Sequence, residues 1–186
     1  MKERIINACR ELALSRGLYS FTVDELAAQA GVSKRTIYRY FKSKDEIVGE
    51  TLDLFLESMA EQLEEIIRSE HDVRVMINRI LEQLLFRGQF LFNGRGLNDL
   101  RIYYPQLWEK IDKFRIGKME LLIQTILTKS ASERTAEIDP RIITAVIVGA
   151  VQAVINPDFI LENGFTFEEA TQQLSGILMM LLADNC

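Results

Sequence analysis

The chain has 186 residues, of which 48% are hydrophobic and 26% charged, the balance of a folded globular protein rather than a disordered or fibrous one. No apolar run reaches the roughly 18 residues that a membrane span needs, and the charged, amphipathic start MKERIINACRE is unlike a secretory signal. Cys9 and Cys186 form neither a metal spacing nor a disulfide framework. We therefore expect a cytoplasmic protein with no membrane partner, metal or cofactor.

The formal net charge of −5 is unevenly divided along the chain. Residues 1–48 hold nine basic and six acidic side chains, or +3, whereas the remainder holds 13 basic and 21 acidic ones, or −8. A mildly basic N-terminal segment, followed by an acidic remainder, is typical of a protein whose N-terminal segment binds a polyanion. A charge of +3 alone is weak support, because many solvated helical faces carry as much.

Apolar residues recur three and four positions apart along most of the chain, which predicts an all-α protein with about nine helices and no sheet. The first helix spans residues 2 to 16 and ends at Gly17, a left-handed stop. Thr22 and Glu25 form a capping box that starts a helix of about eight residues. Gly31 ends that helix, and Ser33 caps a third one running to about residue 40.

A second capping box, Ser43 to Glu46, opens a long helix through about residue 67. Helices are then predicted near residues 72–91 and, after a glycine-containing turn at 93–96, near 97–103. Pro105 begins a long helix to about residue 129, and residues 139–140 supply an N-cap and a first-turn proline for a helix that ends before residue 157. Residues 166–169 cap the last helix, near 167–182.

Residues 22–44, TVDELAAQAGVSKRTIYRYFKSK, predict a helix-turn-helix. Small residues at 27, 28 and 30 permit close packing of its two helices, Gly31 supplies the turn, and Val32 and Ile37 fill the space between. The second helix is then free to enter a DNA major groove. Its outer face offers the cations and hydroxyls that bind base edges and phosphates.

The first 48 residues resemble the TetR/AcrR family. The resemblance rests on Ala8, Gly17, Thr22-Val23, Leu26-Ala27, Ala30-Gly31-Val32-Ser33, Thr36-Ile37-Tyr38, Tyr40-Phe41, Ser43-Lys44 and Ile47-Val48. It implies a three-helix DNA-binding domain over residues 1–48 and a helical effector-binding and dimerisation domain over residues 49–186. The implied partners are double-stranded operator DNA, a second copy of the chain and a small apolar or aromatic effector, and the implied role is that of a repressor.

The predicted DNA-binding residues lie on or beside the second helix of the motif. They are Thr22, Ser33, Lys34, Arg35, Thr36, Tyr38, Arg39, Tyr40 and Lys44. The resemblance implies that Tyr38, Tyr40 and Lys44 contact phosphates, with Thr22 and Ser33 assisting. It also places Lys34, Arg35 and Arg39 where base readers are found. Position 35 is often a small residue in such proteins, so Arg35 adds either a guanine contact or a phosphate contact, and both readings stay open.

The last two long helices carry the dimer interface that the resemblance implies, and their apolar stripes agree with it. The predicted interface residues are Val146, Gly149, Ala153, Leu174, Ile177, Leu178 and Leu181. The alternative is that these stripes face the core of their own subunit.

Bulky residues over 50–135 suggest an effector pocket, for which the candidates are Phe90, Tyr103, Tyr104 and Trp108. Such residues at helical spacing also fill ordinary cores.

Two other classes of function are alternatives to a regulator. An enzyme is disfavoured, because no nucleophile elbow, phosphate loop, zinc spacing or paired-carboxylate motif is present, and residues 94–99 lack the third glycine of a dinucleotide site. A helix-turn-helix adaptor that binds a protein partner without an effector is the other alternative. It predicts no steep salt dependence of DNA binding.

Overall fold

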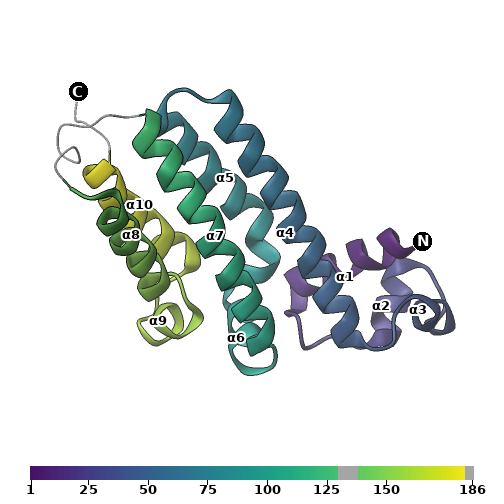
Figure 1. Cartoon of the computed structure of the whole chain (residues 1–186). Coiled ribbons are helices and arrows are strands. Elements are labelled where there is room, and N and C mark those ends of the chain that lie inside the picture. Colours follow the sequence, from purple (N-terminus) through teal and green to yellow (C-terminus); the bar gives the residue numbers. More distant parts are fainter. Residues whose placement is uncertain (130–137, 183–186) are drawn as a thin grey trace.

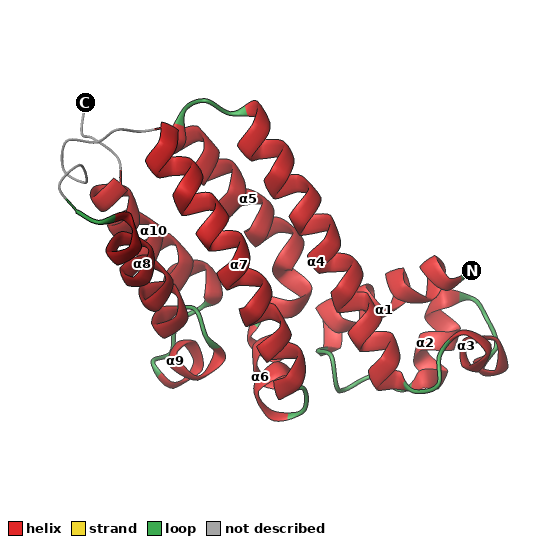
Figure 2. Ribbon diagram, in the orientation of Figure 1, coloured by secondary structure: helices red, strands yellow, loops and turns green. Residues whose placement is uncertain are grey.

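The computed structural model describes residues 1–129 and 138–182, and that part of the chain is built of helices joined by short loops (Figures 1 and 2). Its elements in order are α1 (Lys2–Arg16), α2 (Val23–Ala30), α3 (Lys34–Tyr40), α4 (Lys44–Ser69), α5 (Val73–Phe92), α6 (Gly94–Ile102), α7 (Pro105–Lys129), α8 (Pro140–Val154), α9 (Pro157–Glu162) and α10 (Phe167–Leu182). The predicted all-α class is confirmed. None of these helices is both long and apolar enough to cross a membrane.

Helices α1 to α3 pack with the start of α4 as a small unit at one end of the molecule (Figure 1). Gly31 ends α2 in the left-handed conformation, with φ 61° and ψ 40°, so the chain turns sharply before α3. Leu26 and Ile37 are fully buried between the helices, as the motif requires. The helix-turn-helix geometry therefore follows from one glycine and a few apolar contacts.

The predicted helix starts agree with the structure in most cases. The capping boxes at Thr22 and Thr166 both form, and Asp139 caps α8 ahead of a first-turn proline. Ser43 also caps α4, accepting a hydrogen bond from the Glu46 N–H at 3.1 Å. The Glu46 carboxylate, however, accepts from the Lys42 N–H instead of closing the expected box.

Three local expectations need correction. Gly17 has φ 93° but ψ 169°, so it ends α1 with an extended backbone at positive φ rather than as a left-handed helical stop. Gly94 and Gly96 lie in the first turn of α6, which Asn93 caps through a 2.8 Å bond from the Gly96 N–H, and not in a turn before the helix. The six-residue α9 is an element that the periodicity did not predict.

The larger part of the molecule is a bundle in which α7 packs against α4 on one side and α8 on the other (Figure 1). Helices α8 and α10 pack together at the side farthest from α3 (Figure 2). Helix α6 touches α1, α5, α7 and α9, so it lies where the small N-terminal unit meets the bundle. The predicted boundary between residues 48 and 49 falls inside α4, which runs continuously from one part into the other.

Candidate nucleic-acid interface

Helix α3 has one buried face and one exposed face. Ile37 is fully buried, and Phe41, which ends the helix, is 1% exposed. The opposite face carries most of the polar and aromatic residues that the sequence assigned to DNA: Ser33, Lys34, Arg35, Tyr38, Arg39 and Tyr40 are exposed, and Thr36 is half-buried. The helix thus presents a continuous polar surface while two apolar side chains fix its orientation.

Two large aromatic side chains of α3 lie in solvent. Tyr38 is 48% exposed and Tyr40 is 38% exposed, whereas the neighbouring Phe41 is buried. The Arg39 guanidinium carbon lies 5.1 Å from the centroid of the Tyr40 ring, and its Nη2 is 3.4 Å from the Tyr40 hydroxyl. Tyrosine hydroxyls held beside a cation suit contacts with phosphate oxygens.

The N-terminal turn of α3 is ordered by its own side chains. Ser33 Oγ accepts from the Thr36 N–H at 3.0 Å and lies 2.9 Å from Thr36 Oγ1. Lys34 donates to Asp24 across the turn at 2.8 Å, and this hydrogen bond raises the pKa of the lysine. Both partners are solvent-exposed, so the ion pair is weak and a phosphate can replace Asp24. Arg35 has no hydrogen-bond or ion-pair partner among the described residues.

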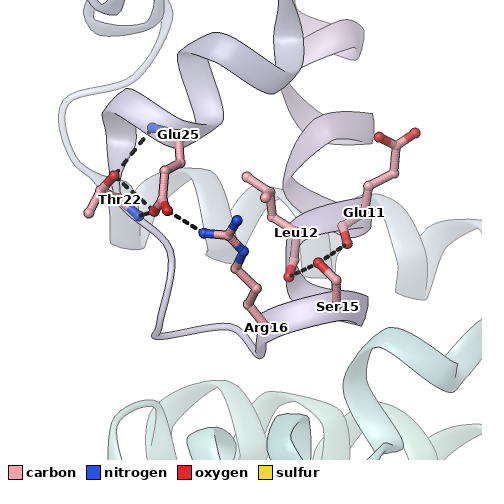
Figure 3. Close-up of polar contacts among 6 residues, drawn as sticks. All are labelled: Glu11, Leu12, Ser15, Arg16, Thr22 and Glu25. Carbon is pink, nitrogen blue, oxygen red and sulfur yellow. Dashed lines mark hydrogen bonds and ion pairs between the residues drawn. The ribbon is translucent and has the colours of Figure 1, made fainter.

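Thr22 contributes to the N-terminal unit chiefly as a helix cap (Figure 3). Its N–H donates to the Glu25 carboxylate at 2.7 Å, and its hydroxyl accepts from the Glu25 N–H at 3.2 Å. The hydrogen bond from the Thr22 backbone, with a further one from its hydroxyl and an ion pair with Arg16, lowers the pKa of Glu25. The Thr22 hydroxyl, which already bonds to Glu25 in the helix cap, would therefore have to contact a phosphate in addition to these bonds or in place of one of them.

Lys44 lies at the start of α4 and is engaged within the protein. Its ammonium donates to the Tyr19 carbonyl and lies 4.3 Å from the ring centroid of Phe21 and 5.1 Å from that of Tyr19. Burial lowers the pKa of this lysine. Lys44 thus braces the α1–α2 loop against α4, a role that the sequence pattern did not reveal.

A polar cluster joins α6 to the N-terminal unit. The buried Asp99 carboxylate accepts from the Tyr19 N–H at 2.9 Å, and Arg95 donates to the Ser15 carbonyl at 2.7 Å. Tyr103 stacks on Tyr19 with the ring centroids 3.6 Å apart. Sequence reasoning missed Asp99, because its partner lies 80 residues away and no local pattern connects them.

Tyr104 belongs to the same cluster. It is 2% exposed, and its hydroxyl donates to Asp45 at 3.3 Å. Burial, followed by the charge of Asp45, raises its pKa above the ordinary value. Tyr103 and Tyr104, expected in an effector pocket, therefore lie at the junction between α6 and the N-terminal unit.

Asp99→Ala is expected to lower the free energy of unfolding by about 1–3 kcal/mol, because the Tyr19 N–H loses its acceptor in a part-buried place. The α1–α2 loop should also lose its anchor on α6. Urea denaturation followed by circular dichroism measures the change.

Asn98→Ala is the matched control for this variant, since the amide of the neighbouring, less buried Asn98 makes only a 3.5 Å contact with Arg101. Equal effects of the two substitutions would contradict the role given to Asp99.

Two apolar cavities lie inside the bundle, each of about 150 Å³. The first is lined by residues of α5, α7, α8 and α10, and the second by residues of α4, α5 and α7 with single residues of the α8–α9 turn and α10. Trp108 lines the second cavity, whereas Tyr103 and Tyr104 line neither. Phe90 lies outside the residues whose side chains are described.

The residues expected at a dimer interface divide into two groups. Val146, Gly149, Ala153 and Ile177 are exposed on α8 and α10, together with Ile142 and Met180. Leu174 is 6% exposed and lines the first cavity, as does the half-buried Leu178, so both point into their own subunit. The side chain of Leu181 is outside the described residues.

Comparison with known proteins agrees with this geometry. The model of a family described as "Bacterial regulatory proteins, tetR family" matches residues 5–51. An uncharacterized HTH-type transcriptional regulator of Bacillus subtilis, YvaF, is 28% identical over 96% of this chain and 93% of its own. The fatty acid metabolism regulator protein of the same organism is 27% identical over 82% and 80%.

A TetR transcription regulator from Haloarcula marismortui is similar in structure, with a TM-score of 0.70 over 97% of both chains. At 17% identity this similarity shows the fold. It extends over α4 to α10 as well as the N-terminal unit, so the whole architecture, and not only the helix-turn-helix, is shared.

Proposed function

The chain belongs to the TetR family of bacterial regulatory proteins, and from this membership we propose that it is a repressor whose dimer binds a palindromic operator. It is a transcriptional regulator, as its relatives are. Residues 1–48 are proposed to bind DNA, and residues 49–186 to form the dimer and bind a small effector that releases it. Because α4 crosses this boundary without a break, a displacement of α4 in the bundle would move the DNA-binding unit.

The exposed face of α3 is the observation that carries the proposal. Tyrosine is ordinarily at least partly buried, yet Tyr38 and Tyr40 lie in solvent beside Arg35 and Arg39 on one short helix. A helix of this width fits the major groove, where arginine reads guanine and hydroxyl groups bind phosphates. We assign Lys34, Arg35 and Arg39 to base edges and Tyr38 and Tyr40 to phosphates.

The small number of base pairs that one helix-turn-helix contacts implies that the protein binds DNA as a dimer. A single helix-turn-helix reads few base pairs, so specific binding needs two units about 34 Å apart on the DNA. The exposed apolar residues of α8 and α10 are proposed to form the symmetric interface, with Gly149 allowing close approach. To shift the ratio of the DNA-binding form of the dimer to its released form from 99:1 to 1:99, an effector must bind the released form about 10⁴-fold more tightly.

DNA binding tests the proposal through its salt dependence. The protein should bind the palindrome nearest the promoter of its own gene, with an affinity that falls steeply as salt rises, because phosphate contacts release counterions. Tyr40→Ala should weaken binding to all sequences alike, whereas Arg39→Ala should cost about 1–3 kcal/mol at the operator and relax discrimination. Fluorescence anisotropy at several salt concentrations measures both effects.

Lys42→Ala is the control for these variants, since Lys42 is an exposed cation beyond the end of α3. It should alter neither discrimination nor folding. Salt-insensitive binding, or no binding to any promoter fragment, would contradict the proposal and favour an adaptor that binds a protein partner. The reverse pattern for Tyr40 and Arg39 would refute their assigned roles.

A further inference from the structure

The two cavities of the bundle are neighbours that share a wall. Six residues line both of them: Ile80, Leu84, Arg115, Met119, Leu122 and Ile155. Five of the six are flexible or branched apolar side chains on α5, α7 and the end of α8. Small changes of their rotamers would join the two spaces into one elongated apolar chamber. A chamber of that shape suits a ligand with an extended or aromatic apolar body.

Arg115 is the exception in this wall, because it is a cation between two apolar spaces. Its side chain is 17% exposed. Nη1 donates to the Ile155 carbonyl, and Nη2 forms an ion pair with Asp112. The buried Nε has no acceptor among the described residues. A buried N–H without a partner is costly, and on a charged group more so.

Lys118 and Thr171, two other polar residues that line the cavities, have partners within the protein. Lys118, at the second cavity, forms an ion pair with Glu64 at 2.9 Å. The Thr171 hydroxyl, at the first cavity, donates to the Phe167 carbonyl at 2.7 Å. Arg115 is therefore the lining cation with an unused donor, and an anionic ligand group would satisfy it with a charge-assisted hydrogen bond.

We propose that the effector is a small molecule with an apolar body and an anionic group, and that Arg115 binds the anion while the two cavities hold the body. This inference rests on the proposed function, because it names the effector class for the bundle. The Ile155 carbonyl that Arg115 holds belongs to the C-cap of α8, the helix with the exposed dimer stripe. An anion that draws the guanidinium away from Ile155 would thereby act on a helix of the proposed dimer interface, and through that interface on the spacing of the two DNA-binding units.

Trp108 provides a direct readout of binding. It is the only tryptophan of the chain, it lines the second cavity, and its ring centroid is 5.6 Å from the Arg115 guanidinium carbon. Straight-chain carboxylates, from hexanoate to dodecanoate, should be titrated against the full-length protein while Trp108 emission is recorded. The alcohol of each chain length is titrated in parallel. The carboxylates should bind at least about tenfold tighter than the alcohols.

Arg115→Met tests the residue itself, since methionine keeps an unbranched apolar stem and removes the charge. The variant should bind a carboxylate and its alcohol equally, and its unchanged affinity for the alcohol shows that the chamber is intact. Arg68→Met is the matched control, because Arg68 lies exposed on α4 and pairs with Glu65. It should keep the wild-type preference.

Asp112→Asn gives an independent check, because it frees Nη2 of Arg115 from its ion pair. Affinity for the carboxylates should rise while that for the alcohols stays unchanged. Equal binding of acids and alcohols by the wild type, a preference that survives in Arg115→Met, or no response to any member of the series would overturn the inference.

These outcomes are separable from those of the DNA experiment. Salt-dependent operator binding, without a preference for carboxylates over alcohols, would support the DNA-binding function and reject this effector class. An Arg115-dependent preference without operator binding would keep the ligand site and reject the DNA-binding function.

Discussion

A Val146→Glu variant is expected to be monomeric at concentrations where the wild type is a dimer. Val146 is 56% exposed on α8, one turn from Ile142 at 59%, and Ile177 on the neighbouring α10 is 63% exposed. In a twofold-symmetric dimer each substitution occurs twice, so two carboxylates would be buried against apolar surface without partners. Burying such a charge costs several kcal/mol, and we expect the dimer dissociation constant to rise at least about 100-fold. Sedimentation equilibrium measures it.

Val75→Glu is the matched control for this experiment. Val75 is also an exposed valine, at 44%, but lies on α5 rather than on α8 or α10. This control should remain dimeric and bind the operator like the wild type. The Val146 variant should fold normally, since its side chain is already in solvent within one subunit, and should lose most of its operator affinity. A dimer that persists in Val146→Glu would place the interface elsewhere.

Phe41→Ala is expected to lower the free energy of unfolding by about 3–5 kcal/mol and to abolish DNA binding. The ring is 1% exposed at the end of α3, where it packs in the core of the N-terminal unit and lies 5.6 Å from the Lys2 ammonium. Its removal leaves a cavity beneath the proposed recognition helix. The loss is comparable to the whole stability of a small domain, so the N-terminal unit should unfold first.

Urea denaturation can follow the two parts of the molecule separately. Trp108 lies in α7 and reports on the bundle, whereas circular dichroism reports on all helices. For Phe41→Ala the dichroism should fall at lower urea than the fluorescence changes. Tyr40→Ala removes a neighbouring aromatic ring that is 38% exposed, and it should shift stability by no more than about 0.5 kcal/mol. Equal destabilisation by the two variants would show that Phe41 does not support the unit.

Much of the N-terminal unit could be predicted because its signals are local. A capping box needs residues three apart, and a left-handed turn needs one glycine, so Thr22, Glu25 and Gly31 predicted the ends of α2 correctly. The alternation of buried and exposed positions on α3 follows from helical periodicity, which separates Ile37 from Tyr38 and Tyr40. For the same reason the helices from α4 onward, apart from α9, were predicted as helices.

Long-range contacts set the limit of such reasoning. The stripe of α10 has apolar residues on more than one side, and only the packing of α10 against α8 and α5 turned Leu174 inward and left Ile177 outside. Two tyrosines assigned to a pocket lie instead at the junction, because α6 packs against α1 there. Helix α9 is six residues long, too short for periodicity to reveal, and its N-cap Asn156 became visible only in the fold.

The sequence by itself therefore determined the helical class, the helix-turn-helix and the residues on its exposed face, since each depends on neighbours a few positions apart. The tertiary structure decided the partners of Lys44, Asp99 and Arg115. A charged side chain takes its role from the groups that surround it, and for Lys44 and Asp99 those groups come from distant parts of the chain. For Arg115 the Ile155 carbonyl is 40 residues away, and only packing could place this cation between two apolar cavities with one donor unused.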